Sequence, residues 1–211
     1  NLLYTMIIVP LVLSLLLLIF PKTQYGARAT LFMIAATLNL IFAFGVFGMA
    51  EMTLLIPWAG FGINLALRVY SFSQFMILSA AIVTFLVALY SVSYMKRKDY
   101  SGSFFFYYLL NMLMVNGAFL ANNIVVMLFF WEGLMVLLFA IIIISSRQNP
   151  RTAMKAIILN GVADLLLMLG IIATCIQAGT LMMDAIQDIP LQGLGLLGFV
   201  CMFLGAIGKS G

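Results

Sequence analysis

Long apolar runs alternate with short polar connections along the whole chain, and charged residues, prolines and clusters of Asn, Gly and Ser mark where each run ends. Seven of these runs have the length of about 20 residues that an α-helix needs to cross a bilayer. They cover residues 2–20, 29–50, 74–95, 104–121, 123–144, 153–177 and 192 onward. Because a bilayer core offers no water to backbone groups, the pattern predicts an all-α bundle of membrane-spanning helices.

The connection at residues 51–73 has a different pattern from the other connections. Apolar and polar residues alternate in it, and Pro57, Gly60, Gly62 and Asn64 interrupt the alternation. This pattern predicts a short strand or hairpin that caps one end of the bundle.

The composition excludes a soluble protein and most cofactor sites. Apolar residues make up 65% of the chain and charged residues 8%, against about 25% charged residues in soluble globular proteins. The sequence has no histidine, and its two cysteines, Cys175 and Cys201, lie inside apolar runs. Since zinc, haem, copper and iron–sulfur sites use these residues, we expect no metal, no cofactor and no redox centre of the chain's own.

The basic residues are distributed unequally between the two sides of the bundle. Eight of the ten fall in or beside the connections that follow the first, third and fifth runs: Lys22, Arg28, Lys96, Arg97, Lys98, Arg147, Arg151 and Lys155. Arg68 lies on the opposite side, together with Glu51, Asp184 and Asp188. The positive-inside rule therefore predicts that the N-terminus lies outside. The net charge of +4 is explained by this topology, and we expect no nucleic-acid partner.

A few ionisable residues lie inside the predicted spans. Glu132 is about 12 Å below the outer boundary of the fifth span and Asp164 about 16 Å from the inner boundary of the sixth. Lys209 lies within the seventh run, and Lys155 just inside the sixth. A charge at the bilayer centre costs about 2.5–3.5 kcal/mol, and such residues commonly mark ion pathways.

Each of these residues also has a structural interpretation. Glu132 could form a hydrogen bond to a neighbouring helix, and Asn160 could form a local contact with Asp164, four residues away. Lys155 could extend to the membrane surface, and the depth of Lys209 depends on residues after Gly211. Asn39 and Asn111 are predicted to form hydrogen bonds between helices.

The seventh run is rich in glycine. Residues 193–198 satisfy the pattern G-x-G-x-x-G, but no strand precedes them, so small-residue helix packing is preferred to a dinucleotide site. Gly205 and Gly208 precede Lys209 closely, and this arrangement predicts a broken helix over residues 205–211.

Several segments of the chain resemble a known family. They are LVALYSVSYM (86–95), FLANNIVVMLFFWEGLMVL (119–137), RTAMKAIILNGVADLLLMLG (151–170), GTLMMDAI (179–186) and GAIGKSG (205–211). They resemble the antiporter-like subunits shared by respiratory complex I, membrane-bound energy-converting hydrogenases and Mrp-type cation/proton antiporters. The sequence departs from the family at Tyr70, where many relatives carry an acid, and at Gly211, where the closest complex I subunits more often carry alanine.

The resemblance implies roles for the buried ionisable residues. Glu132 and Lys209 match the glutamate and lysine that form the central ion pair of the family. Asp164 and Lys155 match residues that modulate this pair or line the proton access route. Family members contain two inverted repeats, so residues 2–95 would hold the first three helices and residues 104–211 the start of the first repeat.

Two functions follow as hypotheses. The first is translocation of protons or sodium ions by a non-redox subunit of a larger oxidoreductase, either an NADH:quinone oxidoreductase or an energy-converting hydrogenase. The second is a stand-alone Mrp-type sodium/proton antiporter subunit. A purely structural membrane anchor is a third reading, disfavoured by the buried charges. Both leading hypotheses predict other membrane subunits as partners and a location in the inner or plasma membrane of a prokaryote. The first residue is not Met and the last lie within an apolar run, so residues 1–211 are interpreted as one transmembrane domain of a longer chain.

Overall fold

The computed structural model describes residues 2–21, 23–60, 63–145, 150–186 and 189–210. The side chain of Lys209 lies outside this description, as do Lys22, Arg147 and the side chain of Arg151. In chain order the elements are α1 (Leu2–Ile19), α2 (Tyr25–Val46), β1 (Met52–Gly60), β2 (Ile63–Val69), α3 (Ser71–Met95), α4 (Ser101–Leu120), α5 (Ile124–Ser145), α6 (Pro150–Ala178), the 3₁₀ turn η1 (Met183–Ala185) and α7 (Leu194–Ser210).

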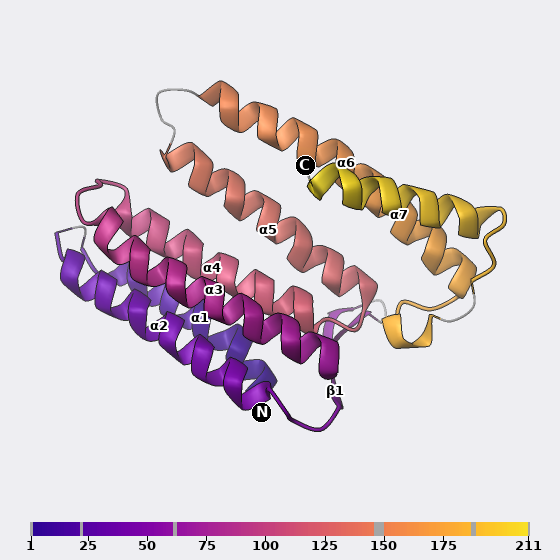
Figure 1. Ribbon diagram of the computed structural model, residues 1–211, viewed down its shortest axis with the longest axis horizontal. Helices are drawn as coiled ribbons and strands as arrows, with labels where there is room; N and C mark the ends of the chain where they lie inside the picture. Colours follow the sequence, from indigo (N-terminus) through magenta and orange to yellow (C-terminus); the bar gives the residue numbers. More distant parts are fainter. Residues whose placement is uncertain (1, 22, 61–62, 146–149, 187–188, 211) are drawn as a thin grey trace.

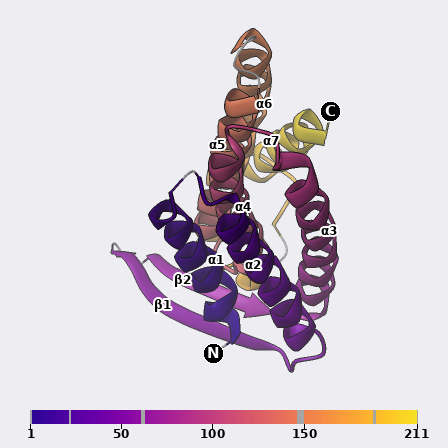
Figure 2. The same ribbon diagram turned by 90° about the vertical axis from the view of Figure 1, so that its left-hand side faces the viewer.

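The helix bundle predicted from the apolar runs is confirmed. Six of the described helices are long and apolar enough to cross a membrane, and α7 is a shorter apolar helix. The chain is therefore an integral membrane protein. Helices α1–α4 form one compact group, α5 packs on α4, and α6 and α7 lie together beyond α5 (Figures 1 and 2).

The helices of the first group bury two apolar clusters at different heights. The cluster nearer the basic connections contains Phe32 and Phe105, whose rings stack with centroids 4.5 Å apart. The other cluster, near the hairpin, contains Leu3, Val46 and Leu67. Large side chains on the outer surface remain exposed, as expected where lipid is the solvent.

A polar network crosses the first group between these clusters. Pro10 lies inside α1 and has no N–H, so the carbonyl of Met6, one turn earlier, loses its helical partner. The side-chain amide of Asn116 donates to this carbonyl at 2.8 Å and to Oδ1 of Asn39 at 2.7 Å. The predicted interhelical role of Asn39 is confirmed, and the network satisfies a backbone group that lipid could not.

The predicted hairpin is also confirmed. Strands β1 and β2 pair antiparallel, with Met52 opposite Val69 and Pro57 opposite Asn64. The hairpin lies across one end of the bundle (Figure 2). Because the adjoining cluster contains Leu67 and Val69, one face of β2 packs on the helices.

A hydrogen-bonded strip extends from the hairpin to the connection between α6 and α7. The backbone N–H of Asn122 donates to Ala66 at 2.8 Å, and its carbonyl accepts from the N–H of Met183 at 2.7 Å. Ile124 donates to Leu181 at 2.9 Å. The strip therefore joins β2, the α4–α5 connection and residues 181–183.

Side-chain charges reinforce this strip. Nε of Arg68 donates to Glu51 at 2.8 Å, and Nη1 lies 3.8 Å from a carboxylate oxygen of Asp184. The hydrogen bond to Glu51, and then the charges of the two acids, raise the pKa of the Arg68 guanidinium. The sequence predicts Arg68 on the same side as Glu51 and Asp184, and in the structure it contacts both acids.

The predicted break in the seventh helix is wrong for the described residues, because α7 is a continuous helix from Leu194 to Ser210. Its glycines permit close packing on α6 instead. A Cβ at Gly205 would lie 2.8 Å from the backbone nitrogen of Leu167 and 2.9 Å from the carbonyl oxygen of Ala163. Gly198 of α7 and Gly170 of α6 are similarly close to the opposite helix. Among the glycines at residues 193–198, the predicted role in helix packing is therefore confirmed for Gly198.

Candidate functional site

Glu132 lies on α5 and lines a cavity of about 550 Å³. The cavity lies between α4, α5 and α6, with Met114 and Met168 contributed by the two flanking helices. A Cβ at the next residue, Gly133, would lie 2.6 Å from Sδ of Met114. The glycine after Glu132 therefore leaves room for the Met114 side chain of α4 beside the carboxylate.

Asp164 is buried, with 3% of its surface exposed. The preceding residue, Ala163, contacts Gly205 and Gly208 of α7. On the α5 side, Met168 lies one turn after Asp164 and lines the Glu132 cavity. Asp164 therefore lies on α6 between the surface that packs on α7 and the surface that faces α5.

The backbone of Lys209 reaches the level of Asp164. A Cβ at Gly208 would lie 3.0 Å from Cβ of Ala163, and Lys209 is the next residue of α7. Helix α7 packs mainly along α6. Because the side chain of Lys209 lies outside the described part of the chain, its ion pair with Glu132 stays a prediction.

Lys155 is exposed on α6, whereas Asp164 is buried. Nine residues separate them, which is two and a half turns at about 3.6 residues per turn, so they occupy opposite faces of the helix. The structure therefore places on opposite faces of α6 the two residues that the family resemblance matches to groups that modulate the ion pair or line the proton access route.

A second cavity, of about 330 Å³, lies between the same three helices. It is lined by Asn111, Trp131, Leu134, Met135, Leu138 and Asn160. Asn111 thus faces a cavity, where the sequence predicted a hydrogen bond between helices. Sequence reasoning missed this cavity, although Asn111 and Asn160 are polar residues within long apolar runs.

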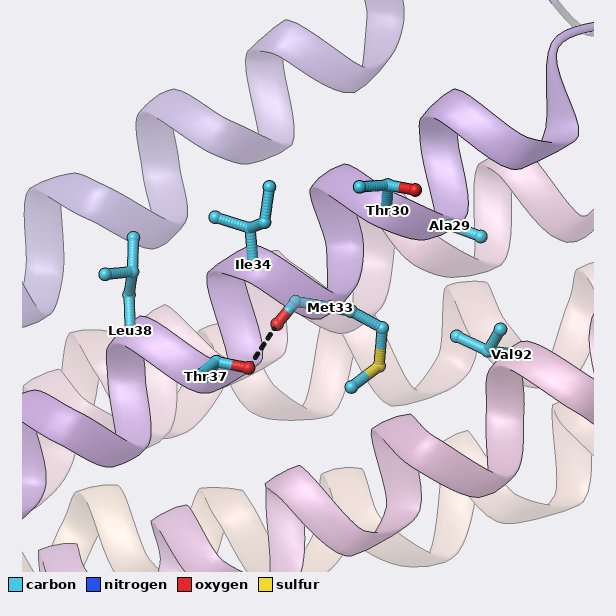
Figure 3. Close-up of a pocket in the computed structure, with 7 residues that line it drawn as sticks. All are labelled: Ala29, Thr30, Met33, Ile34, Thr37, Leu38 and Val92. Atoms are coloured by element: carbon cyan, nitrogen blue, oxygen red, sulfur yellow. Dashed lines mark hydrogen bonds between the residues drawn. The ribbon is translucent and has the colours of Figure 1, made fainter.

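A third cavity lies on the outer side of α2. It has a volume of about 430 Å³, and Met33 extends from α2 toward Val92 of α3 (Figure 3). The hydroxyl of Thr37 donates to the carbonyl of Met33 at 2.8 Å, so it is satisfied within its own helix. No ionisable side chain lines this cavity, and it is not a candidate site.

The described residues also offer no site for a metal ion. They contain no group of three His, Cys, Asp or Glu side chains with suitable positions.

The fold and the buried acids define a polytopic membrane protein with ionisable side chains inside its helix bundle. A family described as NADH:quinone oxidoreductase/Mrp antiporter, transmembrane, matches residues 121–211. A second, described as NADH-ubiquinone oxidoreductase (complex I), chain 5 N-terminus, matches residues 55–106. Together the two matches cover residues 55–106 and 121–211, and they support the antiporter-like subunit family for this chain. No match was found among curated proteins.

Three solved structures share the fold. A subunit of an archaeal membrane-bound sulfane sulfur reductase is 20% identical with a TM-score of 0.76, covering 96% of this chain and 43% of that one. A chain of respiratory complex I from Thermus thermophilus is 20% identical with a TM-score of 0.77. The match covers 95% of this chain and 43% of that one. A chain of the Mrp complex from a Dietzia species is 16% identical with a TM-score of 0.81. The match covers 97% of this chain and 24% of that one. The chain spans less than half the length of each of these relatives.

Proposed function

We propose that this chain is the N-terminal part of a non-redox subunit that translocates protons or sodium ions within a larger membrane oxidoreductase. The observation that carries the proposal is the burial of Asp164 between α5 and α7, close to the cavity of Glu132. A purely structural bundle gains nothing from an acid at this depth, since burial penalises the charged form. Family membership supports the same function.

The chemistry follows from two opposing effects on a buried carboxyl group. Removal from water favours the neutral acid, whereas a nearby cation favours the carboxylate. In the proposed mechanism, Lys209 moves between Asp164 and Glu132 and changes which of them holds a proton. A proton bound from one side can then be released to the other.

We also propose how the chain fits into the family architecture. Helices α1–α3 are the first three helices of the subunit, and α4–α7 begin the first inverted repeat. The partners are other membrane subunits, since the relatives of known structure belong to multi-subunit membrane complexes. The proposed location is a prokaryotic inner or plasma membrane.

A second candidate is a subunit of an Mrp-type sodium/proton antiporter. The fold shared with the Mrp complex supports it, just as the fold shared with complex I supports the first candidate. The two candidates differ in their response to sodium ions. Proton movement that depends on a sodium gradient supports the antiporter, whereas proton movement driven by electron transfer without sodium supports the oxidoreductase subunit.

The proposed function predicts that Asp164→Asn abolishes translocation. Asparagine keeps the shape of the side chain but cannot ionise, so we expect proton movement to fall by about a hundredfold or more. The measurement is dye-reported proton movement in membrane vesicles at matched levels of assembled complex. Asp184→Asn is the matched control, because Asp184 lies outside the membrane spans and is exposed. Wild-type translocation by an assembled Asp164→Asn complex contradicts the proposal.

The proposed orientation predicts which connections a reagent reaches from outside. The α3–α4 connection lies at the same end of the bundle as the end of α1, the end of α5 and the start of α6, and the hairpin and η1 share the other end (Figure 1). In a variant lacking Cys175 and Cys201, we expect a membrane-impermeant thiol reagent added outside to label Ile186→Cys and leave Lys98→Cys unlabelled. Labelling of position 98 and not of position 186 contradicts the proposed orientation and indicates the opposite one.

A further inference from the structure

Two carboxamides from different helices face the 330 Å³ cavity between α4, α5 and α6. Asn111 comes from α4 and Asn160 from α6, and apolar side chains of α5 form much of the remaining wall. Within the described part of the chain, neither carboxamide forms a hydrogen bond to another residue. Both side chains are half-buried, and an amide without a protein partner hydrogen-bonds to water, so the cavity has the chemistry that retains water.

The cavity is large enough for several water molecules. One water needs about 10–15 Å³ of the space that a water-sized probe can occupy, and this cavity provides about 330 Å³. Each carboxamide has two donors and one acceptor oxygen, so the pair can bind water in either orientation. Neither side chain titrates, and an ordered water chain between them can pass a proton without trapping it.

Asp164 lies between this cavity and the one that holds Glu132. Asn160 is one turn before Asp164 on α6, and Met168, one turn after it, lines the Glu132 cavity. On α5 the adjacent residues Trp131 and Glu132 line one cavity each. A path along α6 from the Asn cavity to the Glu132 cavity therefore passes Asp164.

We propose that Asn111 and Asn160 are positioning residues that hold a chain of water molecules and so deliver protons to Asp164 from the basic side of the bundle. The inference rests on the proposed function and names the access route to its buried acid. The cavity extends along α5 to Leu138, about 10 Å from the end of the helix at Ser145, on the basic side. Lys155 lies on the opposite face of α6 from Asp164, so the carboxamide face provides the more direct route.

Hydration of the cavity is tested first, without reference to transport. Asn160→Cys is made in the complete protein within its native complex, with Cys175 and Cys201 replaced by alanine. A small, positively charged methanethiosulfonate reagent is applied to membrane vesicles from the basic side, because thiols react with it as thiolates in water. Leu165→Cys is the control, since Leu165 is 62% exposed on the outer surface of the helix.

We expect the thiol at position 160 to react about tenfold faster or more than the thiol at position 165. Equal rates overturn the inference, because they show that position 160 is no wetter than a lipid-facing one. The contrast is also expected in a Glu132→Gln background, in which transport is blocked. The labelling result is therefore independent of the proposed function.

Use of the water chain is tested by apolar substitution. Asn111→Leu and Asn160→Leu are each expected to slow proton movement about tenfold, which corresponds to a rise of about 1.4 kcal/mol in the barrier. The double variant is expected to be no slower than the poorer single variant, because both substitutions interrupt one chain. Asn160→Ser keeps a polar group and is expected to retain most of the activity.

Leu134→Ala is the control for changes in packing, since it alters the same cavity wall without removing a polar group. Wild-type proton movement in assembled Asn111→Leu and Asn160→Leu complexes overturns the inference while the proposed function stands. Wild-type movement in the Asp164→Asn complex instead overturns the proposed function, and the labelling contrast still reports on the cavity.

Discussion

Glu132→Gln is expected to leave the complex assembled and to reduce ion translocation by about a hundredfold or more, within the range that a positioned proton-transfer group contributes. Glutamine has nearly the same shape and still forms hydrogen bonds, so the packing of α5 beside Met114 is retained. It cannot bind and release a proton, so the last acid of the proposed route is lost. Glu132→Asp is expected to retain part of the activity because the carboxylate remains, one methylene shorter.

Lys209→Met is expected to resemble Glu132→Gln, because each removes one charge from a pair that acts as a unit. The double variant should then be no worse than the poorer single variant. The measurement is proton movement in vesicles at matched subunit levels, with electron transfer or sodium exchange followed in parallel. Additive losses in the double variant contradict a shared mechanism, and wild-type translocation by Glu132→Gln contradicts the role of the carboxylate.

Asn116→Leu is expected to lower the free energy of unfolding by about 2–3 kcal/mol, because it leaves the Met6 carbonyl buried without a partner and removes the bond to Asn39. Pro10→Ala supplies an N–H one turn after Met6, which can donate to that carbonyl. In the Asn116→Leu background this second change is expected to restore about 1–2 kcal/mol.

Reversible unfolding in mixed micelles measures the coupling between Pro10 and Asn116. Thr37→Val is a suitable control, since the Thr37 hydroxyl bonds only within α2 and is exposed. A rescue of the same size when Pro10→Ala is introduced alone shows a general gain in helix stability. Such a result contradicts the role assigned to the Met6 carbonyl.

The membrane helices and the hairpin could be predicted because their signals are local. An apolar run of sufficient length has few alternatives in lipid, and the alternation at residues 51–73 is typical of strands. The predicted break near Gly205 was wrong because glycine has two uses that sequence alone does not separate. It tolerates irregular backbone, and it also removes the Cβ that keeps two helices apart, which is its use against Leu167.

The candidate site was predicted less completely than the fold. Position along a helix can be counted from sequence, so Glu132 and Asp164 were expected within the fifth and sixth spans, and they lie on α5 and α6. Direction around a helix can also be counted, and the nine residues between Lys155 and Asp164 already indicate opposite faces. The cavity at Asn111 depends on the relative positions of three helices, and no single run contains that information.

The hydrogen-bonded strip from β2 to residues 181–183 has a mechanical consequence. It fastens the start of α5 and the end of α6 to the hairpin at one end of the bundle, through Asn122 and its neighbours. At the opposite end α6 begins at Pro150, far from this attachment (Figure 1). Two helices that pack along their length and are attached at one end can pivot about that attachment. A small rotation of α6 and α7 therefore displaces their residues in proportion to their distance from the strip, and Asp164 lies partway along the lever arm.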